Sequence, residues 1–195
     1  MNDYQLVCDL IRQQFASVVW SHKIQEKQAD IHAEKYSKLE AVNIIAAALT
    51  SCGIVGLIFQ DENSLGLKIA TAIFSFVTLA ISAYYKSFDP SSKSKENKDA
   101  ANKLIGIRNE LLSLIADCHI QEKSAEEIKE RFDEVNLQLN KLYLELPTTS
   151  DRAVDRATVA LKNNEYSYTE DEIDRFLVSS LKGKIKLKET GEKSH

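Results

Sequence analysis

Two long apolar runs separated by a short polar one dominate the hydrophobic pattern of the chain. Residues 41–59 are nineteen consecutive positions without a charged side chain, and residues 67–85 are nineteen more with only Lys68 near the start. As a helix, such a run covers about 28 Å, close to the ~30 Å hydrocarbon core of a bilayer. Residues 60–66 are polar and turn-forming. The pattern predicts a transmembrane helical hairpin; the alternative is a buried helical pair in a soluble protein.

The segment before the first run has the spacing of an amphipathic helix. Its apolar positions recur at intervals of three and four and then thin out amid charge after Trp20. These positions are Tyr4, Val7, Ile11, Phe15 and Val18, followed by Ile24, Ile31, Tyr36 and Leu39. No proline or glycine interrupts residues 3–40. We therefore expect one helix that starts near residue 3 and continues into the first span.

The segment after Pro90 carries a heptad pattern, in which spacings of three and four alternate over six heptads as in a coiled coil or an antiparallel bundle. The positions are Leu104, Ile107, Leu111, Leu114, Cys118, Gln121, Ala125, Ile128, Phe132, Val135, Leu139, Leu142 and Leu146. Gln121 is the polar exception, and Ser124 with Glu127 forms a capping box. The register alone is compatible with one rod. The capping box favours two helices, broken around residues 118–124 and packed against the N-terminal helix.

The remaining residues predict two short helices after Pro147. Ser150 is placed to cap a helix over residues 151–163, and a capping box at residues 169–172 predicts another over residues 170–182. The fold class is therefore an all-α membrane protein, a two-helix transmembrane hairpin with a cytoplasmic helical bundle. Its regions are the N-terminal helix (1–40), the hairpin (41–85, with spans 41–59 and 67–85), the heptad-patterned helical hairpin (91–146) and the C-terminal short helices with a polar tail (147–195).

Lysine placement predicts the orientation of the hairpin. Lysines precede the first run and follow the second, whereas the connecting turn carries Asp61 and Glu62 and no basic residue. Because cytoplasmic loops carry the excess of lysine and arginine, both termini are expected in the cytoplasm, with the short connecting turn on the outer side of the membrane. The net charge of −4 and the pI of about 5.6 argue against direct binding of nucleic acid.

No catalytic, metal or cofactor site is expected. The phosphate-binding, dinucleotide-binding, zinc-protease and nucleophile-elbow motifs are absent from the sequence. The cysteines, Cys8, Cys52 and Cys118, are too far apart for a metal motif. Before the hairpin, His22 and Glu26 are four residues apart, as are Asp30 and Glu34. Polar pairs at this spacing are common on any exposed helix and do not indicate a site. An enzyme is therefore not expected.

Polar and small residues inside the spans are the candidate functional positions. The candidate pore-lining residues are Asn43, Thr50, Thr71, Ser75, Thr78 and Ser82; the candidate helix-packing residues are Ala48, Cys52 and Gly56. Small residues let membrane helices approach closely, and hydroxyl groups can bond across helices. Two interpretations stay open. Either the hydroxyl groups bond their own helix, or several hairpins assemble into a homo-oligomer in which this face lines a wet lumen.

The order of several motifs resembles a known family. Trp20–Ile31 reads W-x-H-K-I-x-E-K-x-A-D-I and leads into the two spans; Leu146–Ser150 reads L-P-T-T-S, an A-x-x-A-L-K run ends at Lys162, and Tyr168–Leu177 reads Y-T-E-D-E-I-D-R-F-L. Over roughly residues 4–182 the chain resembles the SLATT family of bacterial two-transmembrane proteins. The matching positions include Trp20, His22, Lys23, Glu26, Asp30, Pro147, Ser150, Asp174 and Phe176.

The resemblance implies a function that periodicity does not. SLATT proteins are thought to be membrane effectors of anti-phage systems of the abortive-infection type. They are encoded beside nucleotide-messenger synthases, SLOG-type sensors or reverse transcriptases, and are proposed to permeabilise the inner membrane. The family has no established catalytic residues. The expectation is an effector that oligomerises in the bilayer when a sensor protein or nucleotide signal activates it. The alternatives are a non-pore scaffold that recruits a cytoplasmic partner through its bundle, and a soluble helical regulator.

Overall fold

The computed structural model describes residues 3–59, 65–163, 165 and 172–173. The chain divides into two units, residues 1–158 and residues 159–195. The helices are α1 (Asp3–Phe59), α2 (Leu65–Phe88), α3 (Pro90–Ile120), α4 (Ala125–Glu145) and α5 (Asp151–Lys162). No strand occurs in the described ranges, which agrees with the predicted all-α class.

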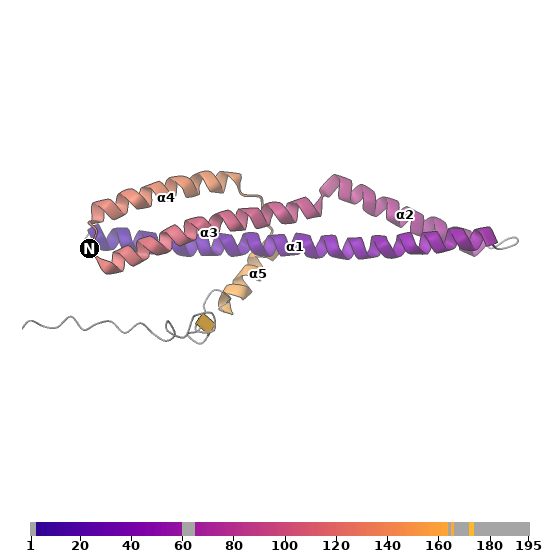
Figure 1. The fold of residues 1–195 in the computed structure, drawn as a ribbon, viewed down its shortest axis with the longest axis horizontal. Coiled ribbons are helices and arrows are strands. Elements are labelled where there is room, and N and C mark those ends of the chain that lie inside the picture. The colour runs from indigo at the N-terminus through magenta and orange to yellow at the C-terminus, as the bar shows by residue number, and fades with distance from the viewer. Residues whose placement is uncertain (1–2, 60–64, 164, 166–171, 174–195) are drawn as a thin grey trace, which may run out of the picture. The chain divides into compact units, whose positions relative to one another are not determined.

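Helix α1 is continuous over its 57 residues, and at ~1.5 Å per residue it is about 85 Å long. It carries both the amphipathic segment and the first apolar run, so the expected cytoplasmic helix and first span are one rigid element. α2 and then α3 run antiparallel along it (Figure 1). The pairing register of α1 with α2 and α3 is nearly constant along the whole of α1. Gly53 lies opposite Thr71, Tyr36 opposite Tyr85, and Tyr4 opposite Cys118.

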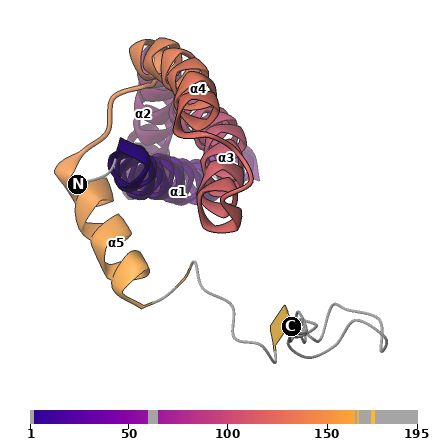
Figure 2. The same ribbon diagram turned by 90° about the vertical axis from the view of Figure 1, so that its left-hand side faces the viewer.

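The hydrophobic core is formed by residues of α1, α3 and α4. The end-on view shows how these three helices are arranged (Figure 2). The predicted stripe on α1 contributes Val7, Ile11 and Val18, with Tyr4 and Phe15 packed beside them. The heptad positions supply the rest: Leu104, Ile107, Leu111, Leu114, Ile128, Phe132, Val135 and Leu139. The heptad pattern is therefore satisfied within one chain, by an antiparallel pair packed on α1.

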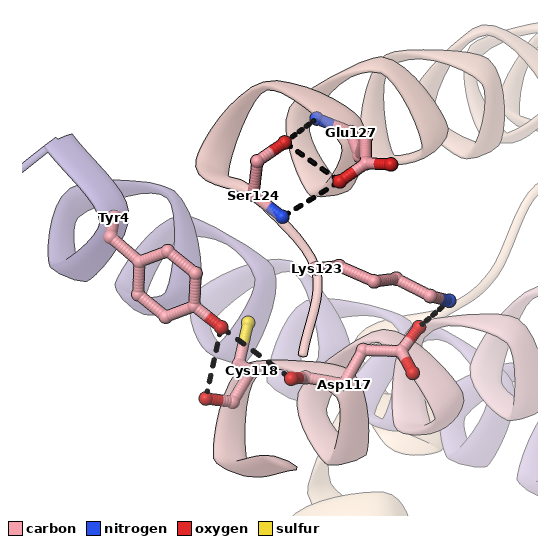
Figure 3. A network of polar contacts seen from close by, with 6 residues as sticks. All are labelled: Tyr4, Asp117, Cys118, Lys123, Ser124 and Glu127. Carbon is pink, nitrogen blue, oxygen red and sulfur yellow. Dashed lines mark hydrogen bonds and ion pairs between the residues drawn. The ribbon is translucent and has the colours of Figure 1, made fainter. Parts of the chain in front are cut away.

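The predicted break between α3 and α4 is confirmed. Gln121 ends α3 in the left-handed conformation (φ 60°), and its N–H donates to the Asp117 carbonyl at 3.0 Å. The capping box then starts α4, because the Glu127 N–H donates to Ser124 Oγ and the Ser124 N–H to Glu127 Oε2 (Figure 3). At the same end the Tyr4 hydroxyl donates to the Cys118 carbonyl at 3.2 Å. This contact joins the first turn of α1 to the last turn of α3.

Helix α2 ends at Phe88 and α3 begins at Pro90, and the chain bends between the two helices (Figure 1). Asp89 occupies the bend with φ 34°, a left-handed conformation that is uncommon for residues other than glycine. Its carboxylate accepts a hydrogen bond from the Ser92 N–H at 3.0 Å and so caps α3. The carboxylate thereby offsets part of the backbone strain, and the chain changes direction at the end of the span.

Parts of the prediction fall outside the described residues. These are the turn with Asp61, Glu62 and Asn63, most of the helix expected over residues 170–182, and the polar tail. In the second unit, the Asn163 N–H donates to the Val159 carbonyl and the Glu165 N–H to the Ala160 carbonyl, which ends α5.

Candidate functional site

The hairpin is closed by a tight approach between Gly53 of α1 and Thr71 of α2. Both residues are buried, in a region where most apolar side chains are exposed. A Cβ atom added at Gly53 would collide with Thr71 Oγ1 and lie 3.2 Å from Thr71 Cβ. Only glycine therefore permits this crossing, as is usual where membrane helices approach closely.

Two of the three residues in the predicted packing stripe are turned away from α2. Ala48 and Cys52 are exposed, and only Gly56 is near α2, where an added Cβ would meet Leu67 Cδ2 at 3.3 Å. The stripe that faces α2 is centred on Ala46 and Gly53, seven residues apart. Residues two positions along a helix point about 200° apart, so Ala48 is turned away from a seam that contains Ala46. Contacts of Ala48 and Cys52 with another chain stay a prediction.

Most hydroxyl groups in the spans bond their own helix. The acceptors lie four residues earlier, at 2.8–3.0 Å: Thr50 to Ala46, Ser51 to Ala47, Thr71 to Leu67, Thr78 to Phe74 and Ser82 to Thr78. Ser75 is exposed and its hydroxyl has no partner within the described part of the chain. This arrangement is what the first of the two interpretations expects. It leaves the lumen-lining role of these residues a prediction.

Asn43 differs from the hydroxyl residues. Its Oδ1 atom is buried and lacks a hydrogen-bond partner among the described residues. By the register of the hairpin, Asn43 lies level with residues 78–81 of α2, inside the expected bilayer boundary. An unsatisfied amide oxygen costs ~1–3 kcal/mol, so this atom favours a donor from water or from another chain.

Beneath the hairpin, a layer of buried amide side chains joins α1 to the segment between α4 and α5. Gln25 Nε2 donates to the Pro147 carbonyl at 3.0 Å. Gln28 Oε1 accepts from the Ser150 N–H at 2.9 Å and from the Ser150 hydroxyl at 2.8 Å. The hydroxyl predicted to cap α5 is thus used to bind Gln28, because the amide oxygen faces it across the interface.

The polar layer brings together two segments that carried the family resemblance, residues 20–31 and 146–150. His22 and Lys23 are buried, and Lys23 Nζ lies 2.9 Å from Glu26 Oε2. Trp20 is 37% exposed, and Asp30 is exposed. In the layer, the Pro147 carbonyl accepts a hydrogen bond and the Ser150 hydroxyl donates one. Asp174 and Phe176 lie outside the described residues.

Burial is the main influence on the pKa of the two histidines here. It lowers the pKa of His22, with Arg108 and Lys23 acting in the same direction and Glu26 against them. Burial also lowers the pKa of His32, aided by Lys93 and Lys35. His32 Nε2 lies 2.8 Å from Gln28 Nε2, so a neutral ring can accept the amide hydrogen through this atom.

A cavity of about 270 Å³ opens beside this layer, lined by Gln28 and His32 of α1, Lys93, Glu96 and Asn97 of α3, and residues 147–150. Asn97 is 2% exposed, and its Oδ1 atom has no partner in the described residues. A second cavity of about 380 Å³ shares Glu96 and Pro147 with the first. No group of three or more histidine, cysteine or acidic residues in the described ranges is arranged to hold a metal ion.

Sequence reasoning missed Gln25, Gln28 and Asn97, although a signal existed for the first. The stripe of Ile11, Phe15 and Val18 continues at the same spacing to His22, Gln25 and Ala29, all buried. The hydrophobic pattern fades at Trp20 because the buried face changes from apolar to polar, while the helix keeps the same face against α3. The buried amides were therefore hidden among charged residues.

Comparison with known families agrees with this geometry. The model of the SMODS and SLOG-associating 2TM effector domain family 4 matches residues 7–172. The chain belongs to this SLATT family. SLATT proteins are two-transmembrane effector domains associated with bacterial conflict systems, and α1 and α2 supply stretches long and apolar enough to cross a membrane. The chain is therefore a membrane protein. No curated protein and no solved structure matches it.

Proposed function

We propose that this SLATT protein is an inner-membrane effector that oligomerises and permeabilises the membrane when a partner sensor or a nucleotide signal acts on its cytoplasmic bundle. Both termini lie in the cytoplasm in this proposal, and the infected cell is the one that is killed.

The observation that carries the proposal is the continuity of α1. The same helix packs against α3 and α4 in the bundle and against α2 in the hairpin, with no break between Asp3 and Phe59. A tilt imposed on the bundle therefore becomes a tilt of the first span, since a helix transmits rigid-body motion. The polar layer at Gln25 and Gln28 lies between the two regions and is suited to change partners.

Oligomerisation is supported by Asn43. No described residue of the same chain satisfies its amide oxygen, and two spans cannot enclose a pore. Assembly of several hairpins supplies a donor from a neighbouring chain or from water in a lumen.

The first test interrupts α1 at the membrane boundary. Ala41→Pro removes one helical hydrogen bond and kinks the helix, whereas Ala41→Leu keeps it straight. Induced expression followed by a depolarisation dye measures leakage, with membrane fractionation as the check on insertion. We expect the leucine variant to leak as the wild type does and the proline variant to leak much less. Equal leakage from both inserted variants would show that α1 does not couple the two regions.

The second test concerns the exposed face of α2. Ser75→Leu with Thr78→Leu makes this face apolar, and Ala80→Leu adds the same side chain to an exposed position on another side. A wet lumen predicts suppressed leakage in the double variant alone. Intact membranes in the presence of abundant, activated wild-type protein would instead favour the non-pore scaffold. The hydroxyl groups of α2 that bond to carbonyls of their own helix are compatible with that alternative.

A further inference from the structure

Five exposed lysines form a band at the cytoplasmic end of the hairpin. They are Lys35 and Lys38 of α1, Lys86 of α2, and Lys93 and Lys95 of α3. None of them forms an ion pair with a described residue. Three helices therefore present unpaired positive charge near this end of the hairpin, where lipid headgroups are expected.

Two of the five lysines are held in place by aromatic rings. Lys35 Nζ lies 4.9 Å from the ring centroid of Tyr84, and Lys93 Nζ lies 5.9 Å from that of Phe88. The two rings stack on each other with centroids 4.8 Å apart. Cation–π contacts orient the ammonium groups while leaving their other N–H donors available. We call these four residues the lysine–aromatic clasp.

The carboxylates of the same band already have partners. Glu34 accepts two hydrogen bonds from Arg156, Glu40 one from Tyr36, Asp89 one from the Ser92 N–H, and Glu96 one from the Ser92 hydroxyl. The anionic groups nearby are thus engaged elsewhere, and the clasp lysines have only the rings. An anion from outside the chain is the partner that the clasp lacks.

The surrounding contacts make the clasp a built feature. The Tyr85 hydroxyl donates to the Tyr36 carbonyl at 3.2 Å, and the two rings pack at 5.4 Å, which fixes α1 to α2 at this level. The bend at Asp89 then directs the first turn of α3, with Lys93, back toward Phe88. Because the geometry exists before any ligand arrives, little entropy is lost when the ligand binds.

We propose that the lysine–aromatic clasp binds the phosphate of an anionic phospholipid of the inner leaflet. Lys35 and Lys93 contact the phosphate, and the exposed ring of Phe88 contacts the glycerol and the first acyl carbons. A lipid uses both parts of the clasp, whereas a free phosphate uses only the ammonium groups. The proposal requires the membrane position of the hairpin and does not depend on pore formation.

Native mass spectrometry of the full chain, titrated with dioleoyl phosphatidylglycerol or dioleoyl phosphatidylcholine, tests this directly. The wild type should bind phosphatidylglycerol more tightly. Lys35→Gln and Lys93→Gln should each weaken it about fivefold, the effect of one lysine at an anionic surface. Phe88→Leu, which keeps apolar contact but removes the ring, should weaken it about two- to fivefold. Lys141→Gln, at an exposed position on α4, is the matched control and should bind as the wild type does.

Three results would overturn the proposal. One is equal affinity of the wild type for both lipids. Another is unchanged phosphatidylglycerol binding by the Lys35→Gln, Lys93→Gln double variant with wild-type helix content by circular dichroism. The third is displacement of the lipid by inorganic phosphate at equal concentration, which would identify a site for the free anion. A double variant that loses helix content is replaced by Lys35→Arg with Lys93→Arg, which keeps both charges and should retain the preference.

Discussion

The two regions joined by α1 are built on opposite principles. In the bundle, the large side chains Ile11, Leu104 and Leu111 are fully buried. In the hairpin, most large side chains face outward, as Ile44, Ile58 and Phe76 do. The buried residues there are mainly small, namely Ala46, Gly53 and Thr71, with Ile81 as the large exception. One helix therefore presents a bulky stripe to its partner at one end and a small-residue stripe at the other.

The difference follows from the surroundings of each region. In water, burial of large apolar groups drives packing. In lipid, burial gains little, because the acyl chains are as apolar as leucine, so close approach and van der Waals contact decide the pairing. A substitution should therefore destabilise the bundle when it removes side-chain volume, and destabilise the hairpin when it adds side-chain volume. The changes below test this contrast, from the largest expected effect to the smallest.

Leu111→Ala in α3 should destabilise the bundle by about 2–5 kcal/mol, because it leaves a cavity in a fully buried position. Thermal or denaturant unfolding in detergent, followed by circular dichroism, measures the loss. The adjacent Leu112 is 53% exposed, so Leu112→Ala is the matched control and should stay within ~0.5 kcal/mol. Comparable losses from both variants would mean that Leu111 is not a core residue.

Gly53→Ala should destabilise the hairpin by about 1–3 kcal/mol, because its Cβ collides with Thr71. Adding Thr71→Ala removes the colliding hydroxyl and should restore part of the loss in the same unfolding measurement. Gly66→Ala is the control, since an added Cβ there meets nothing within 4 Å; the better helix former should be neutral or stabilising by up to about 1 kcal/mol. Equal effects at the two glycines would contradict the tight crossing.

Gln28→Ala should release the start of α5 by about 1–3 kcal/mol, because the Ser150 N–H and hydroxyl lose their acceptor. Faster hydrogen exchange of the amides at residues 150–154 is the expected readout. Gln13→Ala, at an exposed position of the same helix, should leave that exchange unchanged. If the amides exchange at the wild-type rate in both variants, the polar layer does not hold this segment.

The smallest effect is a pH dependence. Because the folded-state pKa of His22 is lowered, the unfolded chain takes up its proton first as the pH falls. Stability from this group is complete above its ordinary pKa of 6.5 and declines as the pH drops below that value. The melting temperature should therefore fall less between pH 7.5 and 5.5 in His22→Gln than in the wild type. His119→Gln, at an exposed position, should retain the wild-type fall.

The sequence was sufficient to predict the helices and the core of the bundle. There, apolar residues recur at helical spacing among polar ones, and this contrast shows which face of each helix is buried. The heptad positions of α3 and α4 and the stripe from Val7 to Val18 are buried as predicted. The break at residues 121–124 was predictable because Ser124 and Glu127 can cap each other.

The packing face of the first span was not predictable in the same way. Almost every residue of 41–59 is apolar or small, so no contrast shows which side faces α2. The partner of Gln28 is a second case, since Ser150 lies 122 residues away and could equally have capped its own helix. The left-handed Asp89 is a third, because its carboxylate has to compensate for the conformation that the bend imposes.

The contacts of α1 with residues 143–156 share one sequence separation. Ser21 pairs with Tyr143, Gln25 with Pro147, Gln28 with Ser150 and Glu34 with Arg156, each 122 residues apart. An insertion or deletion of one residue within residues 21–34 or within residues 143–156 would misalign every pair that follows it. Evolution can therefore alter the length of one stretch only together with the other, and homologous chains should show matched insertions and deletions at these two places.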